Sequence, residues 1–142
     1  MAQGVLQQLL QRGGMSSVTV ESAGVFAVSG MEATRETTRV LAAAGINCAQ
    51  HRARLVTTAM IEQADLVFVM EQFQAEEIIR RAPKARDKVH LLKPHGLPTE
   101  ALIGSPNIPD PIGKPMEVYE VCFHEVCEAV ARVAKSLGVV NA

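Results

Sequence analysis

The stretch Leu66-Val-Phe-Val-Met70 is a continuous apolar run, with Asp65 before it and Glu71 after it. An unbroken run of this length, rich in valine, is typical of a strand that is buried on both faces. Such strands occur in parallel sheets whose two faces are covered by helices. The stretch therefore predicts an α/β domain with this strand inside its sheet.

The sequence on both sides alternates between helical and strand patterns. Strands are expected at 17–21, 66–70 and 88–92, and helices at 2–12, 34–44, 58–63, 72–81 and about 115–137, with Thr57 or Thr58 as the cap of the third helix. No repeat and no linker interrupts this order. We therefore expect one domain over residues 1–142, with a small parallel sheet flanked by helices.

Composition limits the classes of partner and location. With 48% hydrophobic and 20% charged residues, the chain is globular rather than disordered. A net charge of −1 gives no reason to expect nucleic acid or an anionic membrane as a partner. No apolar run is long enough to cross a bilayer, no signal peptide is present, and the three cysteines lack metal-ligand spacing. We expect a cytoplasmic protein without a metal or another cofactor.

The segment from Lys93 to Lys114 is a long loop, and it contains Ile108-Pro-Asp-Pro-Ile-Gly113. The prolines stiffen the backbone on both sides of Asp110. Two interpretations are open: a turn aspartate that accepts a hydrogen bond from its own loop, or a general acid that protonates a leaving group. Ligands of parallel α/β sheets bind at the carboxyl ends of the strands, where Ser22, Glu71 and this loop are expected.

Six stretches resemble the low-molecular-weight protein-tyrosine-phosphatase family, in particular its bacterial branch that includes protein-arginine phosphatases. They are, in the family's order, Met1-Ala-Gln-Gly-Val-Leu6, Ser22-Ala-Gly-Val-Phe26, His51-Arg-Ala-Arg54, Ala64-Asp-Leu-Val-Phe-Val-Met70, Lys88-Val-His-Leu-Leu92, and Asp110-Pro-Ile-Gly113 with Glu117-Val-Tyr119. Together they cover nearly the whole chain. The resemblance implies a small parallel sheet wrapped by helices.

The resemblance also implies a chemistry that needs no metal. A cysteine thiolate attacks phosphorus, and an aspartic acid at the position of Asp110 protonates the leaving group. The serine matching Ser22 and the histidine matching His51 support the catalytic loop by hydrogen bonds. Phe26, which follows Ser22-Ala-Gly, is either a wall of the substrate pocket or a core or cover aromatic.

The sequence departs from this family at its start. The family's nucleophile lies in a C-x5-R-S loop between the first strand and the first helix, and Met1 matches the residue just after that loop. We therefore expect the chain as given to be N-terminally incomplete and inactive, through a truncated gene model or as a natural remnant. Cys48 to Arg54 fits C-x5-R literally, but Leu55 follows it and it contains no glycine. Packing or an exposed thiol is the favoured interpretation of Cys48.

The other cysteines, Cys122 and Cys127, are expected to fill space in the core. In the family the first strand lies between the strands that match 17–21 and 66–70. Its absence would leave unpaired edges. We expect the gap either to close by direct pairing of these two strands or to be filled by a second chain, which makes the open sheet a surface for a homodimer.

Three functions compete at this stage. The leading hypothesis is hydrolysis of phosphate from a phosphorylated protein or a small phosphate ester. Ile112 and Gly113 stand where tyrosine-specific relatives often carry aromatic residues, which shifts the expected substrate away from phosphotyrosine. A non-catalytic chain that self-associates or binds a partner is the second hypothesis. The third is an arsenate reductase, which is disfavoured because no cysteine lies between Glu71 and Val121.

Overall fold

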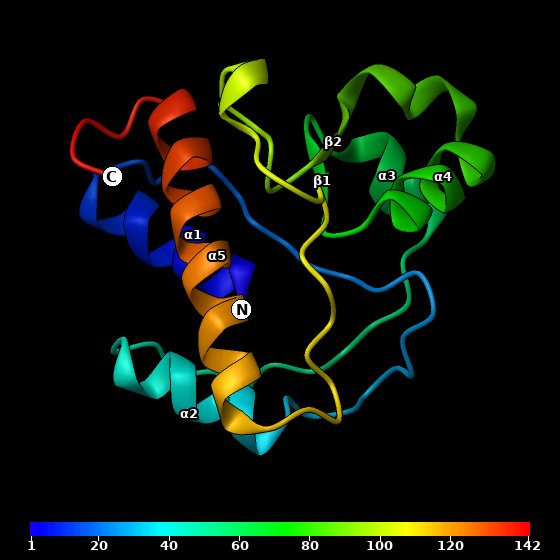
Figure 1. Cartoon of the computed structure of the whole chain (residues 1–142). Coiled ribbons are helices and arrows are strands. Elements are labelled where there is room, and N and C mark those ends of the chain that lie inside the picture. The colour runs from blue at the N-terminus through cyan, green and yellow to red at the C-terminus, as the bar shows by residue number, and fades with distance from the viewer.

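The computed structural model describes residues 1–142 and is an α/β arrangement (Figure 1). The elements follow one another as α1 (Ala2–Arg12), α2 (Arg35–Ala43), α3 (Thr58–Gln63), β1 (Val67–Val69), α4 (Gln72–Arg81), η1 (Pro83–Lys88), β2 (Val89–Leu91), η2 (Thr99–Ala101) and α5 (Met116–Ser136). The five predicted helices are confirmed to within two residues at each end. The two 3-10 helices, η1 and η2, were not expected.

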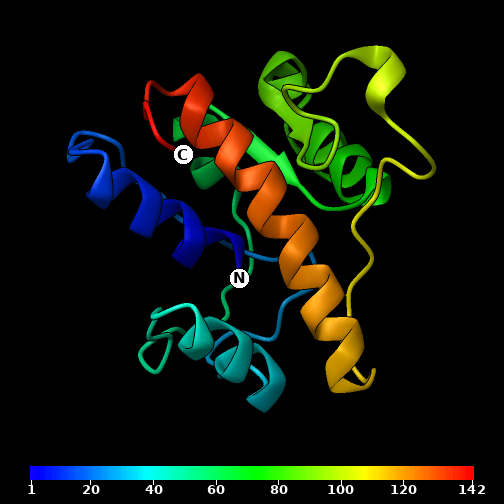
Figure 2. The ribbon, with the colours of Figure 1, turned by 60° about the vertical axis from the view of Figure 1, so that its left-hand side comes forward.

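The two strands pair in parallel, with Val67 opposite Val89 and Val69 opposite Leu91. Side chains of β1 alternate between two apolar clusters because successive residues of a strand point to opposite faces. Phe68 and Met70 pack toward the cluster built on α1 and α5, whereas Val67 and Val69 pack with Ile61 of α3 and Ile78 of α4. Figure 2 shows the strands between α5 and the α3–α4 group.

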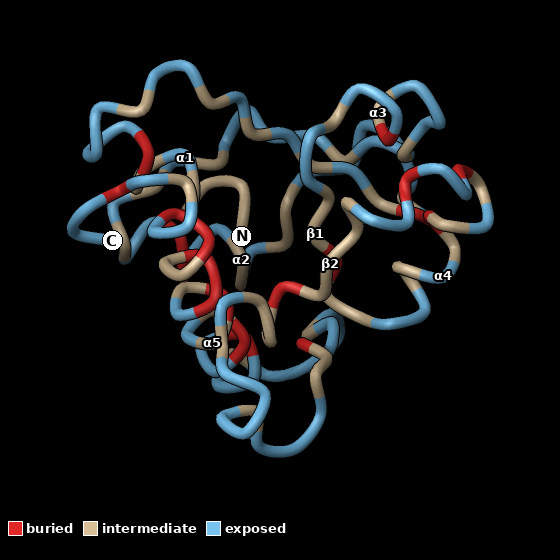
Figure 3. The backbone as a smooth tube through the Cα atoms, turned by 90° about the horizontal axis from the view of Figure 1, so that it is seen from above, coloured by how far each residue is buried: buried red, intermediate tan, exposed pale blue.

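Helix α5 is the centre of the larger cluster. Its buried positions Val126, Ala129, Val130 and Val133 recur at helical spacing, and Ala129 retains no exposed surface. Small side chains at this stripe let α1 approach closely. Figure 3 shows buried backbone along α5. Cys122 belongs to this cluster and Cys127 packs against it, as expected for core fillers.

The predicted strand at 17–21 is wrong. Residues 19–23 form no backbone–backbone hydrogen bond, and the nearest strand-like contact is an isolated parallel bridge between Gly24 and Leu55. Side chains supply part of the hydrogen bonding that a partner strand would provide, because Gln3 and Gln7 of α1 both donate to Val20 O. An extended segment becomes a strand only when a neighbouring backbone pairs with it.

Two further expectations about the sheet need correction. The sheet contains only β1 and β2, so the gap is not closed by direct pairing of 17–21 with 66–70. Burial of β1 on both faces was also expected, yet only Val69 is buried, while Val67 and Phe68 are half-buried. The second edge of β1 has no neighbouring strand.

Helix α4 begins and ends with charged side chains. Glu71 is its N-cap and forms a capping box with Gln74. In the last turns Glu77 forms ion pairs with Arg80 and Arg81, at 2.8 and 2.7 Å. Hydrogen bonds from these arginines lower the pKa of Glu77 to about 2. Arg81 also donates to Val25 O, which holds the loop after Gly24 against α4.

Two histidines lie against Phe68 on β1. The His95 ring meets the Phe68 ring edge-on, with 4.8 Å between centroids, and the His90 ring lies 5.6 Å from that of His95. Burial, and then the neighbouring charges of His90 and Arg132, lower the pKa of His95 below its ordinary value of 6.5. The folded protein therefore favours neutral His95.

We expect acid to destabilise the fold through this histidine. A lowered folded-state pKa gives a stabilising contribution that is complete above pH 6.5 and is lost as the pH falls toward the folded value. Urea unfolding at pH values from 7.5 to 5.5 should show this loss, and His95→Gln should flatten the profile. His51→Gln, a change at an exposed histidine, is the control and should leave the profile unchanged. Equal profiles for wild type and His95→Gln would contradict the assignment.

No helix in the structure combines the length and the apolar character that crossing a membrane requires.

Candidate functional site

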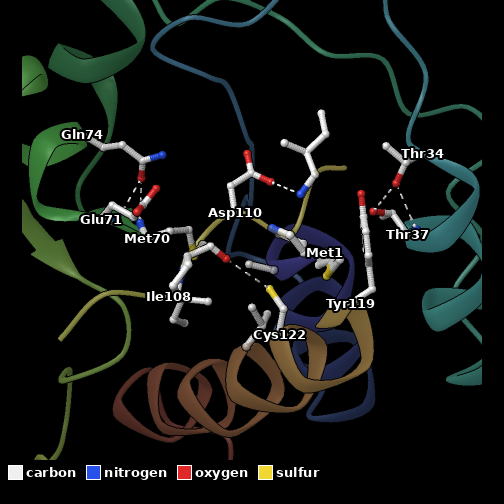
Figure 4. A pocket seen from close by; sticks show the side chains of 15 residues that line it. Met1, Thr34, Thr37, Met70, Glu71, Gln74, Ile108, Asp110, Tyr119 and Cys122 are labelled. Carbon is white, nitrogen blue, oxygen red and sulfur yellow. Dashed lines mark hydrogen bonds between the residues drawn. The ribbon is translucent and has the colours of Figure 1, made fainter. Parts of the chain in front are cut away.

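Three helices begin at one cavity of about 280 Å³. The N-cap residues Met1 of α1, Thr34 of α2 and Glu71 of α4 all line it. Each helix N-terminus carries a partial positive charge, because the first N–H groups of a helix have no partner within the helix itself. Figure 4 shows these residues around the cavity together with Asp110, which comes from the loop before α5. Such an arrangement favours a bound anion.

The loop that carries Asp110 is anchored immediately before this residue. Ile108 retains only 2% of its surface, and its N–H donates to Met70 O at the end of β1, at 2.9 Å. Asn107 accepts from Gln72 N at 3.0 Å, which ties the same loop to the first turn of α4. The Cys122 thiol donates weakly to Pro109 O at 3.9 Å. These contacts fix the point from which the aspartate extends.

Asp110 itself is exposed at the edge of the cavity. Its Oδ1 accepts a hydrogen bond from Ile112 N at 2.9 Å, so the expected turn hydrogen bond is confirmed. Oδ2 has no partner within the chain. The turn fixes the orientation of the carboxyl group and leaves this second oxygen available, so the two interpretations of Asp110 are compatible.

The end of β1 is held by one side chain of α4. Gln74 Oε1 accepts from Met70 N at 2.9 Å and from Glu71 N at 3.1 Å. This double contact turns the chain sharply from the strand into the helix. It also places Glu71 at the cavity, as the position of this residue after the strand predicted.

Hydroxyl groups line another wall of the cavity. Thr34 Oγ1 donates to Thr37 Oγ1 at 3.0 Å and accepts from Thr37 N at 3.2 Å, which caps α2. Tyr119 of α5 lines the same cavity and is 97% buried, with 3% of its surface exposed. This wall is uncharged. The only carboxylates that line the cavity are those of Glu71 and Asp110.

Cys122 is the only cysteine that lines the cavity. Burial raises its pKa, and the carboxylates of Glu125 and Asp110 raise it further. Burial likewise raises the pKa of Cys127. Cys48 is half-buried, packs beside the larger cluster and donates to Thr38 Oγ1 at 3.6 Å. The packing expected for Cys48 is therefore observed.

The other three predicted site residues lie outside the lining of the cavity. The Ser22 hydroxyl donates to Gln3 Oε1, which joins it to the first turn of α1. His51 is exposed and its backbone N–H donates to Cys48 O at 3.0 Å. Phe26 is 72% exposed and stacks on Phe73 with centroids 6.5 Å apart, so it is a surface aromatic in this structure.

Several lining residues were missed by the sequence analysis. Thr34, Thr37, Gln74 and Tyr119 come from three different helices, and none of them follows a strand. Thr34 was detectable as a helix cap, because threonine precedes a helical pattern there. Its position at the site was not detectable, since it depends on how α2 packs against α5.

Comparison with known proteins places this geometry among phosphatases. The family model "Low molecular weight phosphotyrosine protein phosphatase" matches residues 1–140. A protein-arginine-phosphatase of Geobacillus stearothermophilus is 35% identical over 129 residues, which is 91% of this chain and 83% of that protein. The protein-arginine-phosphatase of Bacillus subtilis is 31% identical and covers 96% of this chain and 87% of its own.

A solved structure of a phosphatase shares the fold of this chain. The tyrosine phosphatase Wzb from Escherichia coli, in complex with sulphate, superimposes with a TM-score of 0.83 at 33% identity. The match covers 96% of this chain and 87% of that one. The mixed fold with a small parallel sheet is therefore the fold of these proteins, as the sequence predicted.

Proposed function

Because this chain belongs to the low molecular weight phosphotyrosine protein phosphatase family, we propose that it forms the part of a protein-phosphatase site that binds phosphate and protonates the leaving group. Asp110 is the general acid in this proposal. The substrate is a phosphorylated protein or a small phosphate ester, and the reaction uses no metal.

The convergence of three helix N-termini on one cavity carries this proposal. A phosphoryl group bears negative charge on its oxygens, and the N-termini of α1, α2 and α4 supply positive potential toward the same volume. Oδ2 of Asp110 is available beside this volume. An anion held at the cavity would therefore lie next to the proposed proton donor.

The chemistry divides into two steps. The thiolate of the cysteine in the family's C-x5-R-S loop forms a bond to phosphorus while the bond between phosphorus and the leaving group breaks. Asp110 gives its proton to the departing atom. Water then attacks the phosphocysteine with Asp110 as the base, which releases inorganic phosphate and restores the thiolate. Donation requires protonated Asp110 in the first step, and the second step leaves it protonated again.

We assign Ser22 and His51 to support of the catalytic loop rather than to contact with the substrate. The bond from Ser22 to Gln3 favours this role, because Gln3 lies in the first turn of α1, where the anion would bind. Phe26 and its partner Phe73 form an exposed aromatic pair on the loop after Gly24 and on α4. The pair would contact the protein that carries the phosphate.

Phosphoarginine is the substrate that we favour over phosphotyrosine. Ile112 is 66% exposed beside Asp110 and, with Gly113, offers no aromatic surface for a phenyl ring. Two related proteins are named protein-arginine-phosphatases. With this substrate, Asp110 would protonate the guanidino nitrogen as the bond from phosphorus to nitrogen breaks.

Residues 1–142 on their own should not turn over p-nitrophenyl phosphate at mildly acidic pH without metal. The thiol that lines the cavity, Cys122, has a raised pKa, and protonated thiols are poor nucleophiles. The Cys48 thiol lies outside the cavity, where it donates a hydrogen bond to Thr38 Oγ1. The assay compares wild type with Cys48→Ser and Cys122→Ser, and we expect all three rates to equal that of buffer. Turnover that one of these serine variants abolishes would contradict the proposal and identify the nucleophile.

A further inference from the structure

Positive charge in this chain is concentrated in the segment that joins α4 to β2. Residues 80–88 contain five of the fourteen lysine and arginine residues and one of the fifteen acidic residues, so their net charge is +4. The other residues carry nine cationic and fourteen acidic side chains, a net charge of −5. The total of −1 therefore combines one basic region, at the end of α4 and in η1, with an acidic remainder.

Three of the five cations have partners within the fold. Arg80 and Arg81 both pair with the single carboxylate of Glu77. Lys88 Nζ donates to two carbonyl oxygens at the end of α3, at 2.9 and 2.6 Å. Carbonyl oxygens satisfy the hydrogen bonds of this ammonium group but carry no full charge. One carboxylate therefore serves two arginines, and Lys88 has none.

The other two cations, Lys84 and Arg86, have no such task. Both are exposed on η1. The only ion pairs of residues 80–88 are those of Arg80 and Arg81, and no side-chain hydrogen bond involves Lys84 or Arg86. The fold does not need these two charges for its own hydrogen bonding. They are available to a partner.

A cavity of about 470 Å³ lies beside these cations, between the ends of α3 and α4 and η1. Its charged lining residues are three cations and one carboxylate, namely Arg81, Lys84, Lys88 and Glu62. Two uncharged lining residues, Ala82 and Ala85, are buried in the cluster on α3 and α4, which gives the cavity a packed floor. It shares no residue with the cavity that Asp110 lines. Figure 1 shows α3 and α4 on the opposite side of the molecule from α1 and α5.

We propose that this surface, which we call the basic hollow and define by Arg81, Lys84, Arg86 and Lys88, docks an acidic segment of another polypeptide. Carboxylates of that segment pair with the two cations that have no partner in the chain. A single exposed ion pair contributes little, so the segment must present several carboxylates in a short run. The inference goes beyond the proposed phosphatase chemistry and does not depend on it.

The charge distribution favours a polypeptide over a nucleic acid. A nucleic acid carries negative charge at every step of its backbone and extends past so short a region. It would then meet the remainder of the chain, whose net charge is −5. No aromatic residue lines the cavity, so stacking with bases is not provided there. A short run of carboxylates can end where the basic hollow ends.

A designed peptide tests the basic hollow directly. The probe is a blocked, fluorescein-labelled peptide with the centre Glu-Glu-Leu-Glu-Glu, titrated into residues 1–142 and followed by anisotropy. Its control has glutamine at each glutamate position, which keeps the shape and removes the charge. We expect saturable binding of the probe and at least about tenfold weaker binding of the control. Raising the salt from about 50 to 300 mM should weaken binding of the probe severalfold, because salt screens exposed charges.

A matched pair of charge reversals locates the bound peptide. Lys84→Glu should weaken binding at least about tenfold, whereas Lys135→Glu, the same change at an exposed lysine in the last turn of α5, should weaken it less than about twofold. Backbone amides of η1 should shift in NMR spectra on addition of the probe, and those of α1 should not. Lys84 is exposed and has no partner, so its replacement leaves the packing of the fold unchanged.

Four results would overturn the proposal. They are absence of binding, equal affinity for the two peptides, equal loss from the two charge reversals, and tighter binding of a single-stranded oligonucleotide than of the probe. The last would identify a nucleic-acid surface instead. Self-association of residues 1–142 that Lys84→Glu abolishes would likewise overturn it, in favour of a second copy of this chain as the partner.

Discussion

Replacement of the proposed acid, Asp110→Asn, should lower kcat by about 10²–10⁴-fold in an active form of the protein. The active form for this experiment is residues 1–142 preceded by an added strand and a C-x5-R-S loop. Asparagine is close to aspartate in shape and can retain the contact from Ile112 N through its side-chain oxygen. It cannot donate the acidic proton that the leaving group needs.

The loss should depend on the leaving group. Phenolate is a stronger base than p-nitrophenolate, so phenyl phosphate depends more on protonation than p-nitrophenyl phosphate does. We expect the larger rate loss for phenyl phosphate, with KM changed much less than kcat. Asp87→Asn, a matched change at an exposed aspartate of η1, should leave both substrates unaffected. An equal loss of kcat/KM, which reports the step that expels the leaving group, for the two substrates would show that Asp110 does not act as the acid.

Local patterns were sufficient to predict the helices. Thr57 caps α3, as one of the two expected residues, and Gly45 adopts a positive φ of 73° just after α2. These features depend on a few neighbouring residues. The strand at 17–21 was predicted from the same kind of pattern, but a strand requires a second backbone, and the pattern of one segment does not reveal whether this backbone is present.

The candidate site was only partly predictable for a related reason. Asp110 was identified because two prolines flank it, and Glu71 because it follows a strand. That the N-termini of α1, α2 and α4 meet at one cavity is a property of packing between distant segments. Phe26 illustrates the same point, because its apolar side chain is compatible with a buried wall or with the exposed stack on Phe73 that the structure shows.

Among alanine substitutions in the loop before α5, Ile108→Ala should be the most destabilising. Ile108 is 98% buried, with 2% of its surface exposed in the cluster built on α5, so Ile108→Ala removes buried methylene and methyl groups and leaves a cavity. Such changes cost about 2–5 kcal/mol of the free energy of unfolding. The same substitution at Ile112, which is 66% exposed four positions later, should cost less than about 0.5 kcal/mol.

Urea unfolding of residues 1–142 measures this pair, because both variants make the same chemical change within one loop. A lower midpoint with an unchanged slope would show that stability alone has changed. In the active form described above, Ile108→Ala should also lower kcat more than Ile112→Ala does, because the buried Ile108 side chain packs the loop against the α5 cluster two residues before Asp110. Equal effects of the two substitutions on stability and on kcat would mean that the anchor at Ile108 does not position the acid. A large loss of stability with kcat unchanged would show that packing of Ile108 contributes to stability but not to catalysis. The hydrogen bond from Ile112 N would then be what orients Asp110.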